Sequence, residues 1–229
     1  MIRQIPLDLR WPPHQRLDAF WPGANVPALQ GVTDIAKGGP GWLYLHGASG
    51  TGKSHLLIGA CRAAIESHHV ARYVSLASVP APRGEALAGI EAQGLLAIDD
   101  VQAIAGDREA ERALFDLYNR AKGTSARILF AAVASPAELG IGLPDLVSRL
   151  AMCAQYALRP LDDAGRRAML RIFAGRLGLR LDDEVLDWWF ARQPRDPASL
   201  VALLQRIDRA SLAAQRRITI PFLRELLGK

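Results

Sequence analysis

The sequence predicts an α/β fold: a parallel five-stranded sheet with helices on both faces, followed by a small lid of four helices. Three observations lead to this prediction. A buried strand runs directly into a glycine loop and a helix at residues 42–57. Four further short apolar runs alternate with stretches of helical periodicity, which is typical of parallel sheets. Beyond Pro160 the apolar residues recur only at helical spacing.

The composition is that of an ordinary globular protein. The 229 residues are 50% hydrophobic and 22% charged, with a formal net charge of +5. The basic excess permits a nucleic-acid or acidic partner without showing one, because the arginines are spread along the chain. Cys61 and Cys153 are too few for a disulfide framework or a metal cluster. No apolar run reaches transmembrane length, so we expect a cytoplasmic protein without membrane contact.

The clearest motif is the loop GASGTGKS at residues 47–54, which matches G-x-x-x-x-G-K-[ST]. Its glycines can adopt positive φ and let backbone N–H groups approach a phosphate. Lys53 supplies a charge for the β- and γ-phosphates, and Ser54 a hydroxyl ligand for Mg²⁺. A chance glycine turn is the alternative, and the flanking strand and helix argue against it. We therefore expect ADP or ATP with Mg²⁺ to bind at Gly47, Ser49, Gly50, Thr51, Gly52, Lys53, Ser54 and His55.

The second motif is LLAIDD at residues 95–100. Its four apolar residues predict a buried parallel strand, and its two acids fall where open α/β sheets bind ligands. Asp99 can hold Mg²⁺, usually through water, and Asp100 can orient an attacking water. Capping of the next element is the alternative, since aspartate is a favoured N-cap. Beside a glycine loop, the magnesium role is favoured.

The remaining elements follow in order. Helical periodicity predicts helices over residues 25–37, 55–69, 85–93 and 105–122. Short apolar runs predict strands over residues 42–45, 71–76, 128–133 and 154–158. The four lid helices are expected to begin near Asp162, Asp182, Ser199 and Ile218.

The N-terminal segment has two interpretations. Gln4, Leu7 and Leu9 belong either to a disordered arm or to a short extended peptide that docks in an apolar groove of another protein. The following segment, HQRLDAFWPG at residues 14–23, carries an apolar cluster. This cluster either plugs the sheet edge or, through residues 21–23, helps to wall the base of a nucleotide.

Taken together, these motifs resemble the AAA+ ATPases and, within them, the DnaA clade. The GASGTGKS loop, the LLAIDD strand end, the LPDLVSRL segment and the four-helix lid carry the resemblance. A short chain that opens with QIPLDL and stops after the lid resembles the regulators of this clade that inactivate DnaA. The segments FWPG, LFDLYNRA, GLPDLVSRL and IDRASLAAQRRITIPF extend this likeness over nearly the whole chain.

The resemblance implies a division of labour along the chain. Residues 1–13 would be an arm that binds the β sliding clamp of DNA polymerase III through Gln4, Leu7 and Leu9, so that DNA contact is indirect. Residues 14–160 would bind the nucleotide, and residues 161–229 would form the lid. The protein would stimulate hydrolysis of DnaA-bound ATP and so inactivate DnaA. The sequence leaves open whether the protein forms a homo-oligomer.

The resemblance also implies a catalytic role for Arg149 beside that of Asp100. Arg149 would be an arginine finger that reaches the nucleotide held by DnaA. From the sequence pattern alone, a surface salt bridge is the simpler interpretation of this arginine.

Two positions depart from the AAA+ pattern. At the end of the strand over residues 128–133, a polar sensor residue is replaced by Val133 and Ala134, and Ser135 is the nearest substitute. The sensor arginine that opens the third lid helix is replaced by Ala198, with Arg195 slightly upstream. Both changes predict weak hydrolysis of the protein's own nucleotide at most, although the loop lysine and both strand-end acids are intact.

Two other classes of protein use the same glycine loop. A motor-type ATPase, such as a helicase loader or a DNA-remodelling helper, would need its own hydrolysis apparatus, and the changed sensor positions count against it. A small-molecule P-loop kinase would need arginines over the acceptor phosphate and a compact lid insertion, which the long C-terminal helical region fits poorly.

Overall fold

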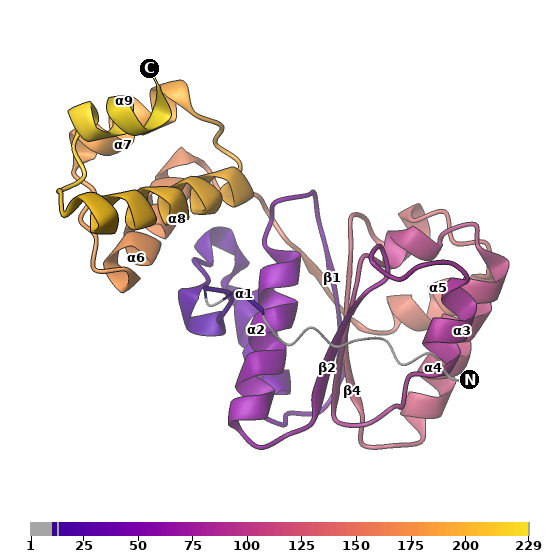
Figure 1. Ribbon diagram of the computed structural model, residues 1–229. Coiled ribbons are helices and arrows are strands. Elements are labelled where there is room, and N and C mark those ends of the chain that lie inside the picture. Colours follow the sequence, from indigo (N-terminus) through magenta and orange to yellow (C-terminus); the bar gives the residue numbers. More distant parts are fainter. Residues whose placement is uncertain (1–10, 13, 229) are drawn as a thin grey trace. The chain divides into compact units, whose positions relative to one another are not determined.

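The computed structural model describes residues 11, 12 and 14–228 of the chain. The chain divides into two compact units, Met1–Pro160 and Leu161–Lys229 (Figure 1). None of the helices formed by the described residues combines the length and the hydrophobicity needed to cross a bilayer.

A five-stranded sheet forms the centre of the first unit, in the spatial order β2-β3-β4-β1-β5, with every neighbouring pair parallel. The parallel five-stranded sheet predicted from the sequence is thus confirmed. The carboxyl ends of β1, β3 and β4 meet at one edge, because His46 pairs with Ala132 and Ile98 pairs with Phe130. The strands are β1 (Trp42–His46), β2 (Ala71–Ser75), β3 (Leu95–Asp99), β4 (Arg127–Ala132) and β5 (Ala154–Ala157).

Helices cover both faces of this sheet, with α1 and α2 on one face and α3, α4 and α5 on the other (Figure 1). Successive strand residues point to opposite faces, so Leu43 and Leu45 join the core under α1 and α2, whereas Tyr44 joins the core under α4. The helices are α1 (Val26–Ala36), α2 (Lys53–Glu66), α3 (Arg83–Ala88), α4 (Arg108–Lys122) and α5 (Pro144–Ala151).

The helix expected over residues 105–122 begins later than the sequence pattern suggested. A short 3₁₀ helix at Val101–Ile104 comes first, and Gly106, with a positive φ of 83°, prevents it from continuing into α4. The side chain of Asp107 then caps α4 by accepting a hydrogen bond from the backbone N–H of Ala110 at 3.1 Å. The glycine and the cap, not the apolar period, set where this helix starts.

The helix expected over residues 85–93 is also shorter. It ends at Ala88 as α3, because Gly89 follows and glycine is a poor helix former. Residues 89–94 then lead to β3 without regular structure.

The second unit consists of four helices, as the apolar spacing predicts. Two of them begin at aspartate caps, where Asp162 accepts from the N–H of Gly165 at 2.7 Å and Asp196 from that of Ser199 at 2.8 Å. The core is built around Trp189, which is 1% exposed. The helices are α6 (Asp163–Arg176), α7 (Asp183–Arg192), α8 (Pro197–Ala214) and α9 (Ile220–Leu227).

Candidate functional site

The glycine loop connects β1 to α2 at the carboxyl edge of the sheet. Gly47, Gly50 and Gly52 have φ values of 152°, 78° and 93°, which confirms that these glycines adopt positive φ. A Cβ at Gly47 would lie 2.5 Å from the carbonyl oxygen of Leu158, and a Cβ at Gly52 would lie 2.6 Å from the ring of Phe20. The loop therefore packs too closely against its surroundings for larger residues.

The loop presents the N-terminus of α2, which begins at Lys53 and has 14 residues. Gly52 is its N-cap, and no side chain caps the N–H groups of the first turn. These N–H groups and the positive end of the helix dipole form the kind of site that binds a phosphate group.

Lys53 lies inside the loop and is 8% exposed. Its Nζ donates hydrogen bonds to the carbonyl oxygens of Gly47 at 2.6 Å and Ala48 at 2.9 Å. Burial lowers the pKa of this amine, while the nearby carboxylates of Asp99 and Asp100 oppose that shift. The loop thus encloses a cation, and two acids lie close enough to affect its pKa.

Asp99 ends β3 and is 1% exposed. Burial raises the pKa of its carboxyl group, and hydrogen bonds from Ser54 and Tyr73 oppose the rise. The Tyr73 hydroxyl donates to Asp99 Oδ2 at 2.9 Å. The structure therefore brings together Ser54 and Asp99, the two residues that the sequence predicts as magnesium ligands. A hydroxyl and a carboxylate oxygen are the hard donors that Mg²⁺ prefers.

Asp100 follows in the left-handed region, with a φ of 57°. Both of its carboxylate oxygens accept hydrogen bonds: Oδ2 from the Ser75 hydroxyl at 2.7 Å, and Oδ1 from the Gln102 amide at 3.1 Å. The amide oxygen of Gln102 in turn accepts from the backbone N–H of Val133 at 3.2 Å. Gln102 thus links the end of β3 to the end of β4.

Sequence reasoning missed Tyr73, Ser75 and Gln102 as parts of this site. Tyr73 and Ser75 lie on β2, and the sequence does not reveal that β2 is the neighbour of β3 in the sheet. For Gln102 a signal existed, since a polar residue two positions after Asp100 on a short turn can reach back to it.

The residues after β4, where the sequence places a sensor residue, do not contact the strand-end acids through their side chains in the hydrogen bonds of the described residues. Val133 is 45% exposed, and the Ala134 carbonyl oxygen accepts from the Tyr44 hydroxyl at 3.0 Å. Ser135, the nearest polar substitute for a sensor residue, donates from its hydroxyl to Glu138 at 2.6 Å in a capping box.

In the second unit, Arg195, the arginine upstream of the changed sensor position, already has hydrogen-bond partners. Arg195 donates to the Phe190 carbonyl oxygen at 2.9 Å and to Asp163 at 2.6 Å. Ala198 is the second residue of α8 and has no polar side-chain group.

The segment before α1 packs against the loop through Phe20. The Phe20 ring lies edge-on to the His55 ring at a centroid distance of 5.5 Å, and the His55 Nε2 is 2.8 Å from the Arg16 carbonyl oxygen. Trp21 is 36% exposed. His55, expected from the sequence to bind nucleotide, thus directs its ring toward this segment.

Replacing Gly47 by alanine should lower the free energy of unfolding by about 2 kcal/mol more than the same change at Gly140. Both glycines have positive φ, but a Cβ at Gly140 meets nothing within 4 Å, whereas one at Gly47 meets a backbone oxygen. Urea denaturation of the two variants measures the difference. Equal losses for both would show that the close approach at Gly47 is easily relieved.

Arg149 lies on α5 and is half-buried. Its guanidinium carbon is 5.9 Å from the centroid of the Tyr118 ring. Within the part of the chain that the structure describes, no carboxylate forms an ion pair with Arg149. The surface salt bridge considered as the simpler interpretation is therefore not formed among these residues.

Gln4, Leu7 and Leu9, the expected partner-binding residues, lie outside the described residues. The chain that follows them is attached to α2. Arg62 lies over the Trp11 ring at 5.9 Å and donates hydrogen bonds to the carbonyl oxygens of Trp11 and Pro12. The segment that follows the arm is thus fixed to the helix that begins at the glycine loop.

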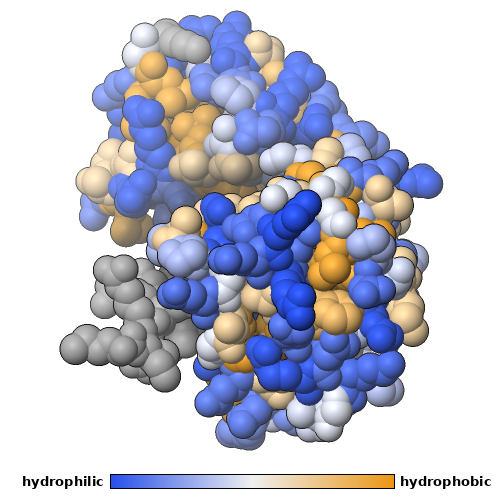
Figure 2. All heavy atoms as spheres, turned by 90° about the vertical axis from the view of Figure 1, so that its right-hand side faces the viewer, coloured by the Kyte–Doolittle hydropathy of each residue, from blue (hydrophilic) through white to orange (hydrophobic). Residues whose placement is uncertain are grey.

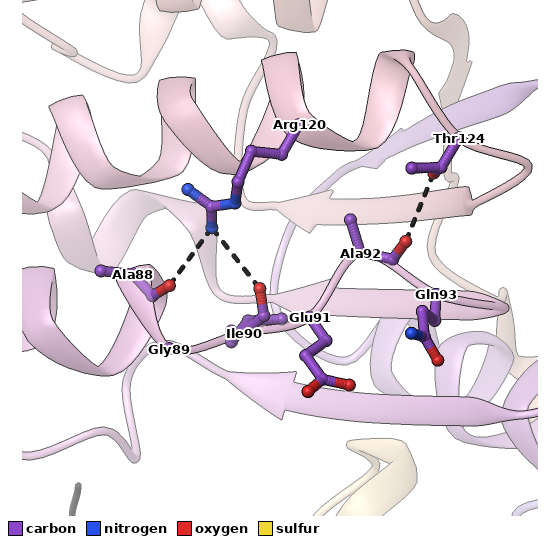
Figure 3. Close-up of a pocket in the computed structure, with 8 residues that line it drawn as sticks. All are labelled: Ala88, Gly89, Ile90, Glu91, Ala92, Gln93, Arg120 and Thr124. Carbon is purple, nitrogen blue, oxygen red and sulfur yellow. Dashed lines mark hydrogen bonds between the residues drawn. The ribbon is translucent and has the colours of Figure 1, made fainter.

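A hollow of about 430 Å³ lies away from this site (Figure 3). Arg120 donates to the carbonyl oxygens of Ala88 and Ile90 there, each at 3.4 Å, and Thr124 to that of Ala92 at 3.3 Å. Its residues precede β3 and β4, so it lies at the amino edge of the sheet, opposite the loop. Figure 2 shows this helical side of the first unit as mainly hydrophilic.

Comparisons with known proteins agree with this architecture. Residues 163–227 match the family model described as "Hda, lid domain". Domain III of the replication initiation protein DnaA from Thermotoga maritima has a TM-score of 0.76 and 22% identity, over 95% of this chain and 97% of that one. AMPPCP-bound DnaA from Aquifex aeolicus has a TM-score of 0.69 and 22% identity, over 86% of this chain and 65% of that one. The RuvB Holliday junction branch migration motor of Thermotoga maritima has a TM-score of 0.67 and 16% identity, over 93% of this chain and 71% of that one.

The fold defined by the parallel sheet, the glycine loop and the helical second unit is that of an AAA+ protein of the DnaA type. The second unit thus resembles the lid domain of Hda, and the fold resembles that of DnaA domain III.

Proposed function

We propose that the protein is a nucleotide-binding regulator of replication initiation. Held on the β sliding clamp, it stimulates hydrolysis of the ATP bound by DnaA and so inactivates DnaA. The observation that carries this proposal is the combination of a DnaA-type module with a lid of the Hda type. DNA is reached indirectly, through the clamp, in the cytoplasm.

ADP or ATP with Mg²⁺ is the ligand of the protein's own site. The uncapped start of α2, the enclosed Lys53 and the adjacent Ser54 and Asp99 support this assignment. Lys53 offsets phosphate charge, and Ser54 and Asp99 hold the metal, which supplies charge neutralisation. Solved structures with the same fold include DnaA bound to AMPPCP.

This bound nucleotide serves mainly as a structural ligand. Asp100 would have to orient an attacking water, but both of its oxygens already accept hydrogen bonds from Ser75 and Gln102. Val133 and Ala134 offer no polar side chain at the end of β4. Hydrolysis of the protein's own ATP is therefore slow.

Arg149 acts on the nucleotide of DnaA instead. A guanidinium supplied from a neighbouring molecule stabilises the charge that spreads over the transferred phosphoryl group in the transition state. Its planar fork of N–H donors matches phosphate oxygens. The lack of an ion pair at Arg149 among the described residues supports this role, because the group need not be released from a carboxylate first.

The double replacement Gln4→Ala with Leu7→Ala should weaken binding to immobilised clamp by about tenfold or more. A peptide of this length makes a small contact, so each anchoring side chain carries a large share of the affinity. Surface plasmon resonance measures the change, and Asp8→Ala, which lies between the anchors, is the matched control. Unchanged binding of the double variant would show that the arm is not the clamp-binding element.

A further inference from the structure

Glu111 on α4 is a fully buried acid outside the nucleotide site, at 1% exposure. Among the described residues it has no ion-pair partner. Its carboxylate instead accepts three backbone hydrogen bonds: from Gly106 at 2.8 Å, from Gly142 at 3.0 Å and from Leu143 at 2.9 Å. A buried carboxylate is tolerated where such donors satisfy it, so these contacts explain its presence.

The three donors belong to two separate segments. Gly106 follows the short 3₁₀ helix that begins directly after Asp100. Gly142 and Leu143 immediately precede α5, and Leu143 is the N-cap of that helix, which no side chain caps. One carboxylate therefore joins the segment that leaves the nucleotide site to the entry of the helix that carries Arg149.

A second contact from the same helix supports the far end of α5. Tyr118 lies two turns after Glu111 on α4, and its ring is the one beneath the Arg149 guanidinium. The Tyr118 ring packs edge-on against Trp42 at 4.4 Å and is 5% exposed, so it is a fixed support. α4 thus holds α5 at its start through Glu111 and near its end through Tyr118.

We propose that Glu111 is the positioning residue for Arg149. By fixing the backbone at Gly142 and Leu143, it sets the direction of α5 and so the direction in which the guanidinium is presented. The inference rests on the role of Arg149 in the proposed function. A displacement of a catalytic group by about 1 Å can cost a factor of about 10² in rate, so a remote anchor has a large effect.

The test compares Glu111→Gln with Glu109→Gln, a matched change at an exposed acid of the same helix. Glutamine keeps the side-chain shape, but its NH₂ group cannot accept a hydrogen bond. Hydrogen exchange of residues 140–151 is measured in the protein alone, and turnover of DnaA-bound ATP is measured in the complex with loaded clamp. Tyr118→Leu removes the second contact independently.

Gly142 and Leu143 donate to different oxygens of Glu111, so the glutamine NH₂ group replaces the acceptor of one of them. We expect Glu111→Gln to speed exchange at that one of the two amides about tenfold or more, since it loses its acceptor. The maximal turnover rate should fall about 10- to 100-fold at an unchanged half-saturating concentration. Glu109→Gln should change neither the amide exchange rates nor the turnover rate.

The outcomes separate this inference from the proposed function. Unchanged exchange in Glu111→Gln would overturn the anchor, whatever DnaA does. Faster exchange with full turnover would overturn the positioning role alone. Faster exchange in a protein whose parent never stimulates DnaA would overturn the proposed function, and the positioning role with it.

Discussion

Replacing Arg149 by alanine is expected to reduce stimulated turnover of DnaA-bound ATP to the basal rate of DnaA. An arginine supplied in trans contributes a factor of about 10³–10⁵ to phosphoryl transfer, because it stabilises charge that exists only in the transition state. Alanine removes this group while leaving Leu146 and Leu150, the buried residues of α5, in place. Single-turnover hydrolysis of labelled ATP on DnaA measures the loss.

Two control variants make this result specific. Arg149→Lys keeps the charge but loses the planar fork of donors, so it should restore little of the rate. Arg120→Ala removes an exposed arginine that donates to the carbonyl oxygens of Ala88, the last residue of α3, and Ile90, and it should leave turnover intact. Full stimulation by Arg149→Ala would exclude this residue as the arginine finger.

Replacing Lys53 by alanine is expected to weaken ADP and ATP binding to the protein by about 10²-fold. Hydrogen bonds to a charged group contribute about 1.5–3 kcal/mol, and Lys53 is the cation enclosed by the loop. The fold should persist, because the variant loses a buried charge whose partners are two loop carbonyls. Isothermal titration calorimetry gives the affinity, and circular dichroism checks the fold.

Lys37→Ala is the matched control, since Lys37 is an exposed lysine that follows α1. It should bind nucleotide as the parent does. If Lys53→Ala also bound with parental affinity, the glycine loop would not be the nucleotide site, and the assignment of Ser54 and Asp99 as magnesium ligands would fail with it.

The parts of the fold that depend on local pattern could be predicted from the sequence. The apolar run of β1, the positive φ of the loop glycines and the start of α2 lie within sixteen consecutive residues, 42–57, so each supports the others. The four helices of the second unit follow from apolar spacing in the same way, and Asp162 caps the first of them where the sequence predicts its start. The third begins at Pro197, two residues before the predicted Ser199, because Asp196 caps it.

The parts that depend on long-range pairing could not be predicted. The strand order places β2 beside β3, and only that order brings Tyr73 and Ser75 to the acids 25 or 26 residues further along the chain. Glu111 is similar, because it is one of several charges on a polar helix until the loop before α5, 31 and 32 residues away, folds over it. Chain separation hides such contacts from any analysis of periodicity.

The proposed function requires that the protein acts on the nucleotide of DnaA and not on its own. The most direct measurement loads DnaA with labelled ATP, saturates this protein with AMPPCP, and follows label conversion in the presence of DNA-loaded clamp. We expect conversion to ADP on DnaA even though the protein's own ligand cannot be hydrolysed. Unconverted label on DnaA, with DNA-dependent hydrolysis of free ATP by the protein alone, would exclude the proposed function and indicate a motor-type ATPase.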